Sequence, residues 1–158
     1  MEKKNGPVRA LQTLFMALLY GQILFAILAF ALVKTGIMEP IEDINTEKVY
    51  EVFFLSMAII SALLGFALSK KKTEQAKEIV ALKEKFAMYR SACITKYAMI
   101  EAAALFCIIF YLLSTKWSFL VAALTLIFLF MSQNPIRQRI KTELLVDDTD
   151  VDEMNKSE

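Results

Sequence analysis

Residues 10–33, ALQTLFMALLYGQILFAILAFALV, decide the fold of this chain because none of these 24 residues is charged. At a rise of about 1.5 Å per residue, a helix of this length covers a hydrocarbon core of roughly 30 Å. Only helices and closed barrels satisfy their backbone hydrogen bonds inside a bilayer, and barrel strands alternate apolar with polar residues. This segment is apolar on every side and therefore predicts a transmembrane helix.

Three further apolar segments follow, at residues 52–69, 97–115 and 117–134, and the third span contains a single acid, Glu101. The chain is 57% hydrophobic and only 22% charged, which leaves no room for a soluble domain. We therefore predict an all-α integral membrane protein. Residues 1–146 form one domain with four transmembrane helices.

The basic residues predict the orientation of the spans. Fifteen of the 18 Lys and Arg residues lie before the first span, between the second and third, or after the fourth, and the other two connections hold only Lys34, Lys48 and Lys116. Cationic connections stay in the cytoplasm. We expect a multi-pass inner (plasma) membrane protein of two helical hairpins, with both termini and residues 70–96 cytoplasmic.

The first span also has features of a signal peptide, namely a basic start and the small-residue pattern Ala29-Phe30-Ala31. Its uncharged, largely apolar stretch of 24 residues exceeds the usual 7–15 of a signal-peptide core. The length favours a span that is retained.

The cytoplasmic connection between the hairpins is the most patterned part of the chain. In residues 73–99, apolar side chains recur at alternating steps of three and four: Ile79, Leu82, Phe86, Tyr89 and Cys93. This spacing is typical of a heptad seam, and no Gly or Pro interrupts residues 73–114. We expect a long amphipathic helix continuous with the third span. Two roles fit it: a connector on the membrane surface, or a stalk that packs on a protein partner or on itself.

The C-terminal residues divide into two parts. Asn134-Pro135 predicts the start of a short interfacial helix, with Ile136, Ile140 and Leu144 on one side. Residues 147–158, which begin DDTDVDE, predict an acidic, disordered tail.

Glu101 is the candidate for chemistry inside the membrane. A charged side chain at the centre of a span costs roughly 2.5–3.5 kcal/mol, and neutralising a Glu at pH 7 costs about 3.7 kcal/mol. We expect Glu101 to face the bundle interior, where Gln22, Ser56, Ser61 or Thr125 could supply a hydrogen bond. Two readings remain: a structural Glu bonded to a neighbouring helix or to water, and an ion or proton site. The Ser and Thr hydroxyls have the alternative of bonding their own helix backbone.

Other chemistry finds little support. The chain has no His, and Cys93 and Cys107 lie 14 positions apart on one predicted helix, about 21 Å along its axis. This separation excludes a disulfide between them. No nucleotide-binding or hydrolase motif is present. We expect no catalytic residue, no cofactor, no bound metal and, at a net charge of +1, no nucleic-acid partner.

Two neighbouring stretches carry a family resemblance: KFAMYRSA at residues 85–92 and YAMIEAAALF at residues 97–106. They resemble the element K-x-x-x-Y-R-x-A followed by R-Y-A-x-x-E-x-x-A-x-F, which is shared by small, uncharacterised four-helix inner-membrane proteins found mostly in Bacteroidota. This chain departs from the element at Lys96, where Arg is common, and at Ala102-Ala103, where Gly-Pro is common. The resemblance implies topology and location but no activity.

The sequence thus leaves two functional hypotheses. The first is a non-enzymatic membrane protein that has a structural or interaction role, with the bilayer as its surroundings and the 73–99 helix as a docking element. The second is a small ion- or proton-handling subunit that uses Glu101.

Overall fold

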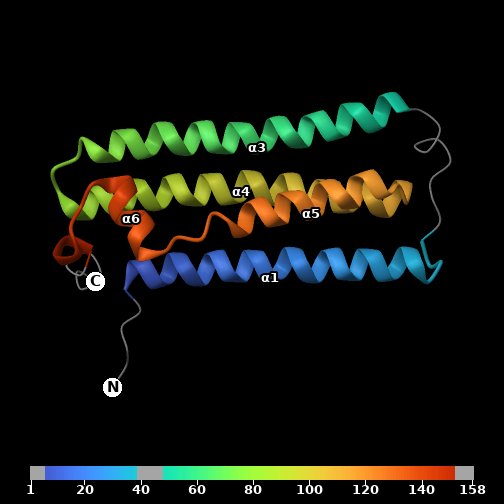
Figure 1. Ribbon diagram of the computed structural model, residues 1–158, viewed down its shortest axis with the longest axis horizontal. Coiled ribbons are helices and arrows are strands. Elements are labelled where there is room, and N and C mark those ends of the chain that lie inside the picture. The colour runs from blue at the N-terminus through green and yellow to red at the C-terminus, as the bar shows by residue number, and fades with distance from the viewer. Residues whose placement is uncertain (1–5, 39–47, 152–158) are drawn as a thin grey trace, which may run out of the picture.

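The computed structural model describes residues 6–38 and 48–151, and within these ranges the chain forms helices and turns without a strand. The helices are α1 (Pro7–Lys34), α3 (Lys48–Lys77), α4 (Leu82–Ser114), α5 (Trp117–Met131) and α6 (Arg137–Leu144), shown in Figure 1. The all-α prediction is confirmed. Helices α1, α3 and α4 are each long and apolar enough to cross a membrane.

Helix α4 occupies the centre of the bundle. It packs against α3, α5 and α1, and α1 also contacts α5. Figure 1 shows α1 and α3 on opposite sides of α4, so the consecutive helices α1 and α3 do not form a tightly packed hairpin. The predicted second hairpin is present, because α4 and α5 are joined by Thr115 and Lys116 alone. Thr115 takes a left-handed conformation (φ 53°) that ends α4.

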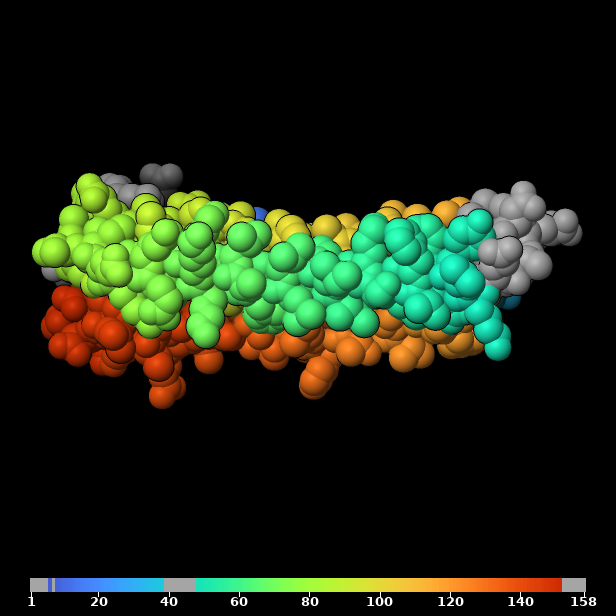
Figure 2. Space-filling view, turned by 90° about the horizontal axis from the view of Figure 1, so that it is seen from above, coloured from blue at the N-terminus to red at the C-terminus, as the bar shows by residue number. Residues whose placement is uncertain are grey.

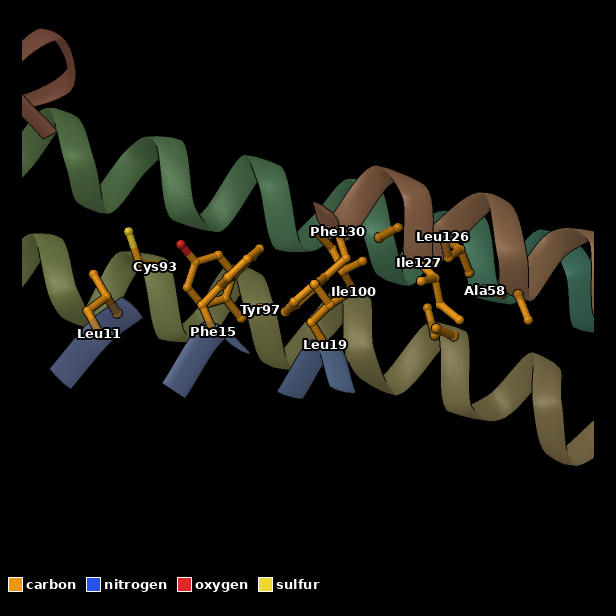
Figure 3. Packing of buried hydrophobic residues seen from close by; sticks show 14 of the residues in the cluster. Leu11, Phe15, Leu19, Ala58, Cys93, Tyr97, Ile100, Leu126, Ile127 and Phe130 are labelled. Carbon is orange, nitrogen blue, oxygen red and sulfur yellow. The ribbon is translucent and has the colours of Figure 1, made fainter. Parts of the chain in front are cut away.

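Aromatic side chains fill the contact between α1, α4 and α5 (Figure 3). The ring of Phe15 on α1 stacks on Phe130 of α5, with centroids 4.9 Å apart, and meets the edge of Tyr97 on α4 at 5.3 Å. Leu19 and Ile100 continue this buried layer along the bundle. Such offset and edge-to-face pairs add to the energy of apolar burial.

Helices α3 and α4 approach closely because the facing residues are small. Ala58, Ala62 and Gly65 are buried on α3, and Ser61 Oγ donates a hydrogen bond to the backbone oxygen of Met99 at 3.4 Å. Small residues on one helix let the backbone of its neighbour come near. This close approach strengthens the dispersion contacts, which matter in a membrane because the hydrophobic effect does not drive helices together there.

The outer surface of the bundle is strongly apolar. Large apolar side chains point outward along the middle of the helices, among them Leu24 and Ile27 on α1, Ile59, Ile60 and Leu63 on α3, and Leu124 and Phe128 on α5. Soluble monomers rarely expose a continuous apolar surface of this kind. It suits a protein whose helices are surrounded by lipid.

The predicted long helix is confirmed only in part. The third span is continuous with an amphipathic segment from Leu82 onward, but the expected start at Thr73 is wrong. Residues 73–77 complete α3, and the chain reverses at residues 78–81. The reversal lets α3 and α4 run antiparallel beyond their apolar segments, which buries Ala76 and Phe86. Of the predicted seam, Phe86, Tyr89 and Cys93 are therefore buried inside this chain, and Ile79 and Leu82 are half-buried.

The C-terminal region also differs from the prediction. Helix α6 begins at Arg137 rather than near Asn134, and its Ile140 and Leu144 are fully buried. Residues 148–151 form a helical turn in which Val151 is only 2% exposed. Residues 147–151 thus differ from the predicted disordered tail, because Val151 provides the apolar anchor that an acidic tail usually lacks. Residues 152–158 lie outside the described part of the chain.

Gly65 generates a stability prediction. A Cβ at this position would lie 2.7 Å from the Cβ of Met99, an atom that cannot move without shifting α4. We expect Gly65→Ala to destabilise the protein by roughly 1–3 kcal/mol, measured as a lower thermal midpoint in detergent. Gly21→Ala is the matched control, because a Cβ there meets nothing within 4 Å. Equal midpoints for the two variants would contradict the close α3–α4 contact.

Candidate functional site

The four residues predicted as an intramembrane site do not converge. Glu101 is half-buried on α4 and follows Tyr97 by one helical turn. Gln22 on α1 is 0% exposed, and neither of its side-chain polar atoms has a hydrogen-bond partner in the part of the chain that the structure describes. Ser61 contacts α4 from the opposite side, at Met99. Thr125 is exposed on α5.

The hydrogen bond expected for Glu101 is absent among the described residues. Ser56 Oγ and Thr125 Oγ1 instead donate to the carbonyl oxygens four positions back, Val52 and Val121, each at 2.8 Å. This is the alternative that the sequence left open for hydroxyl groups in a span. Ser61 is different, because its hydroxyl reaches the neighbouring helix.

A polar cluster that the sequence did not predict lies at the end of the bundle where α3 turns into α4. Tyr89 Oη on α4 donates to Glu143 Oε2 on α6 at 2.8 Å, and Arg139 Nε donates to Glu143 Oε1 at 2.7 Å. Both carboxylate oxygens are thus occupied. The cluster joins α6 to the central helix.

The same end of the bundle also satisfies the irregular backbone between α5 and α6. Tyr97 Oη donates to the carbonyl oxygen of Gln133 at 3.1 Å, Gln12 Nε2 to that of Pro135 at 3.2 Å, and Arg139 Nη1 to that of Ser132 at 2.9 Å. Backbone groups that leave a helix need such partners. Three helices therefore hold residues 132–136 in place.

The electrostatics of Glu143 follow from these contacts. Burial acts to raise its pKa, but the hydrogen bonds from Arg139 and Tyr89 and the positive charges of Lys96 and Arg139 outweigh burial, so the pKa lies below its ordinary value. Burial also raises the pKa of the Tyr89 hydroxyl well above its ordinary value. At neutral pH, a neutral Tyr89 therefore donates to an ionised Glu143.

Lys96 is the unusual member of the cluster. Its side chain is buried, at 6% exposure, and its ammonium lies 5.8 Å from the ring centre of Tyr97. Among the described residues it has neither a hydrogen-bond acceptor nor an ion-pair partner. Burial lowers the pKa of Lys96, and the nearby Cys93 and Glu143 oppose this effect only partly.

Lys96, Arg139 and Glu143 contribute to the wall of a pocket of about 280 Å³ between α3, α4, α6 and the α5–α6 connection. The pocket is near the lower limit of ordinary ligand sites, about 300–1,000 Å³. Figure 2 shows α6 against the half of α3 that ends at Lys77. Nine of the ten lining residues are polar, and basic residues outnumber acidic ones by four to two: Lys70, Lys77, Lys96, Arg139, Glu74, Glu143, Ser69, Thr73 and Gln133, with Phe66.

The arrangement suits the binding of an anion rather than of a metal ion. In the described part of the chain, no three His, Cys, Asp or Glu side chains lie close enough together to hold a metal. The thiol of Cys93 is buried, and burial raises its pKa, which disfavours the reactive thiolate. What the pocket offers is ammonium, hydroxyl and amide donors.

In the sequence, Arg139 and Lys70 stood out only as topology-setting charges. Lys96 had two further signals: its position beside the heptad seam, one residue before Tyr97, and its place in the family element where Arg is common. No pattern in the sequence connects Tyr89 with Glu143, which lie 54 positions apart.

Comparisons of this chain with models of protein families, with curated proteins and with solved structures found no match. The resemblance to small four-helix inner-membrane proteins therefore stays a prediction, and functional conclusions rest on the residues of this chain.

The Glu143 contacts predict a pH-dependent stability. Because the pKa of Glu143 is lower in the folded protein, its contribution is complete above the unfolded value of about 4.3 and is lost as pH falls through the folded value. We expect Glu143→Gln to lower stability at pH 7 by roughly 1–3 kcal/mol, measured by thermal unfolding in detergent. The difference from wild type should shrink below about pH 4.

Glu78→Gln is the matched control, since Glu78 is an exposed acid at the same end of the bundle. It should leave the midpoint unchanged. A Glu143→Gln effect that stays constant from neutral to acidic pH would show that the carboxylate charge is not what stabilises α6.

Proposed function

We propose that this chain is a non-enzymatic, multi-pass inner-membrane protein whose cytoplasmic end is a binding module. Four helices, α1, α3, α4 and α5, cross the bilayer, and α6 closes the module on the inner side. The protein's role is to bind or interact rather than to catalyse a reaction.

The observation that carries this proposal is the closure of α6 over the polar ends of α3 and α4. An interfacial helix that served only as a lipid anchor would turn its apolar side toward the membrane. Here Ile140 and Leu144 are buried against the protein, and Glu143 is bonded to Tyr89. The result is a folded polar unit with a pocket, placed where the apolar helices end.

Two features support a fourth crossing by α5. Its 15 residues rise about 22 Å, and the chain continues for five more residues before α6. In Figure 1, α5 begins at the end opposite α6 and runs back beside α4. A chain that leaves the inner side through α4 therefore returns through α5. The concentration of basic residues at the α6 end supports its cytoplasmic orientation.

Cysteine accessibility tests this topology. In a variant without Cys93 and Cys107, single cysteines replace Ile37, Gln75 or Gln138, which are exposed positions. We expect a membrane-impermeant thiol reagent to label position 37 in intact cells, and positions 75 and 138 only after the membrane is opened. Labelling at 138 but not at 75 in intact cells would show that α5 does not cross. Labelling at 75 in intact cells would place the pocket outside and overturn the proposal.

An ion- or proton-handling role for Glu101 is the second candidate. It is favoured by the position of Glu101 in the apolar part of α4, where it has no ion-pair partner among the described residues, and by the unpartnered amide of Gln22 on the neighbouring α1.

Glu101→Gln separates the two candidates. Under the binding proposal, wild type and variant reconstituted in vesicles should both leave an imposed pH gradient as stable as in protein-free vesicles, measured with a pH-sensitive dye. A proton leak that wild type shows and Glu101→Gln lacks would favour the second candidate instead.

A further inference from the structure

We propose that the pocket beneath α6 binds a phosphate group, with the Lys96 ammonium at its centre and hydroxyl groups of α3 on its wall. The inference rests on the proposed binding role of this end and names its ligand chemistry. The phosphate belongs either to an anionic lipid headgroup at the membrane surface or to a small soluble molecule.

The charges on the pocket wall leave two cations uncompensated. Four basic and two acidic side chains line the pocket. Glu74 is paired with Lys77 at 2.9 Å, and both oxygens of Glu143 are bonded by Tyr89 and Arg139. Lys70 and Lys96 remain without an ion pair among the described residues, so the pocket is suited to an anion.

Of these two lysines, Lys96 gives the stronger argument for a bound anion. Burying an ammonium group is unfavourable unless acceptors replace its hydration shell. The side chain is 94% buried, given its 6% exposure. Its ammonium lies 5.8 Å from the ring centre of Tyr97 and has no hydrogen-bond acceptor or ion-pair partner among the described residues. A ligand oxygen in the pocket would supply the acceptor that the protein does not.

Two hydroxyl groups also lack partners. Ser69 and Thr73 lie one turn apart on α3 and line the pocket, and neither hydroxyl makes a hydrogen bond among the described residues. Elsewhere in the bundle, the hydroxyls of Thr13, Ser56 and Thr125 each bond a carbonyl one turn back. The two α3 hydroxyls are therefore free to donate to a ligand.

These donors favour phosphate over a carboxylate. Ligand carboxylates are typically bound by the planar fork of an Arg, but Arg139 is already engaged with Glu143, Gln133 and Ser132. Lysine and hydroxyl donors that come from two helices suit the oxygens of a phosphate, which point in several directions. The pocket also lies where the apolar part of α3 ends at Ser69 and that of α4 begins after Lys96. Basic pockets between spans at this depth bind lipid headgroups.

Ligand-linked stability tests the proposal on the purified full chain in a phosphate-free maltoside detergent. One arm adds inorganic phosphate, with chloride at equal ionic strength as its control. The other adds short-chain phosphatidylglycerol, with diacylglycerol of the same chain length as its control. We expect the wild-type thermal midpoint to rise by roughly 5–10 °C at about 100 times the Kd.

Lys96→Met removes the charge and keeps the length of the side chain. Without ligand this variant should be at least as stable as wild type, because an unpaired buried charge is gone. Its affinity for the ligand should fall about 10- to 100-fold. Lys85→Met is the matched control, since Lys85 lies on the same helix and outside the pocket, and it should respond to ligand like wild type.

The outcomes distinguish the two ligand sources. A rise in midpoint with inorganic phosphate that Lys96→Met loses supports a soluble phosphate ligand, and a rise with phosphatidylglycerol alone supports a lipid headgroup. No wild-type response in either arm, or an equal response in Lys96→Met, overturns the site. If Lys96→Met does not fold, Thr73→Val and Lys70→Gln test the same pocket by their loss of affinity. The thermal assay in detergent does not depend on how the protein is oriented in the membrane. Its failure would refute the phosphate site, whereas failure of the cysteine-labelling experiment would refute the proposed topology.

Discussion

The structure depends on one constraint: polar groups within the apolar bundle are stabilised by partners inside the same chain, and the buried amide of Gln22 is an exception among the described residues. Helix formation meets this requirement for the backbone, and Ser56 and Thr125 meet it by bonding carbonyls of their own helices. Where the chain leaves α5, the carbonyl groups of Ser132, Gln133 and Pro135 no longer accept from helix amides. Gln12, Tyr97 and Arg139 replace them from three different helices. The irregular connection is therefore one of the points at which the bundle is joined together.

The central position of α4 has a second consequence. Because α3, α5 and α1 all pack on it, α4 needs a small-residue contact on one side and an aromatic layer on the other. Gly65 provides the first by letting α3 approach Met99, and the Phe15, Tyr97 and Phe130 rings form the second. The outer surfaces of α1 and α3 remain apolar and are left to lipid, where tight packing is not required.

At the polar end of the bundle, two buried charged side chains differ in whether they have partners. Glu143 has a donor for each oxygen, so its charge stabilises the attachment of α6 to α4. Lys96 is more deeply buried and has no acceptor among the described residues. A folded protein retains an unpaired charge of this kind only where the surrounding structure bears the cost. Glu143, with both oxygens bonded, is typical of a structural ion pair, whereas the unpaired Lys96 is typical of a ligand pocket.

The sequence by itself determined the class of structure. The length of the apolar segments, the two-residue connection after Ser114 and the uneven distribution of basic residues predicted helices, a turn and an orientation, because each depends only on residues close together in the chain. The tertiary structure alone decided that α4 is central, that α6 folds back, and that residues 73–77 belong to α3. It also decided that Tyr89 meets Glu143 across 54 positions and that Lys96 is buried without an acceptor from residues 6–38 or 48–151. These features depend on packing between distant segments, and burial of a charge is a property of its neighbours rather than of its own sequence.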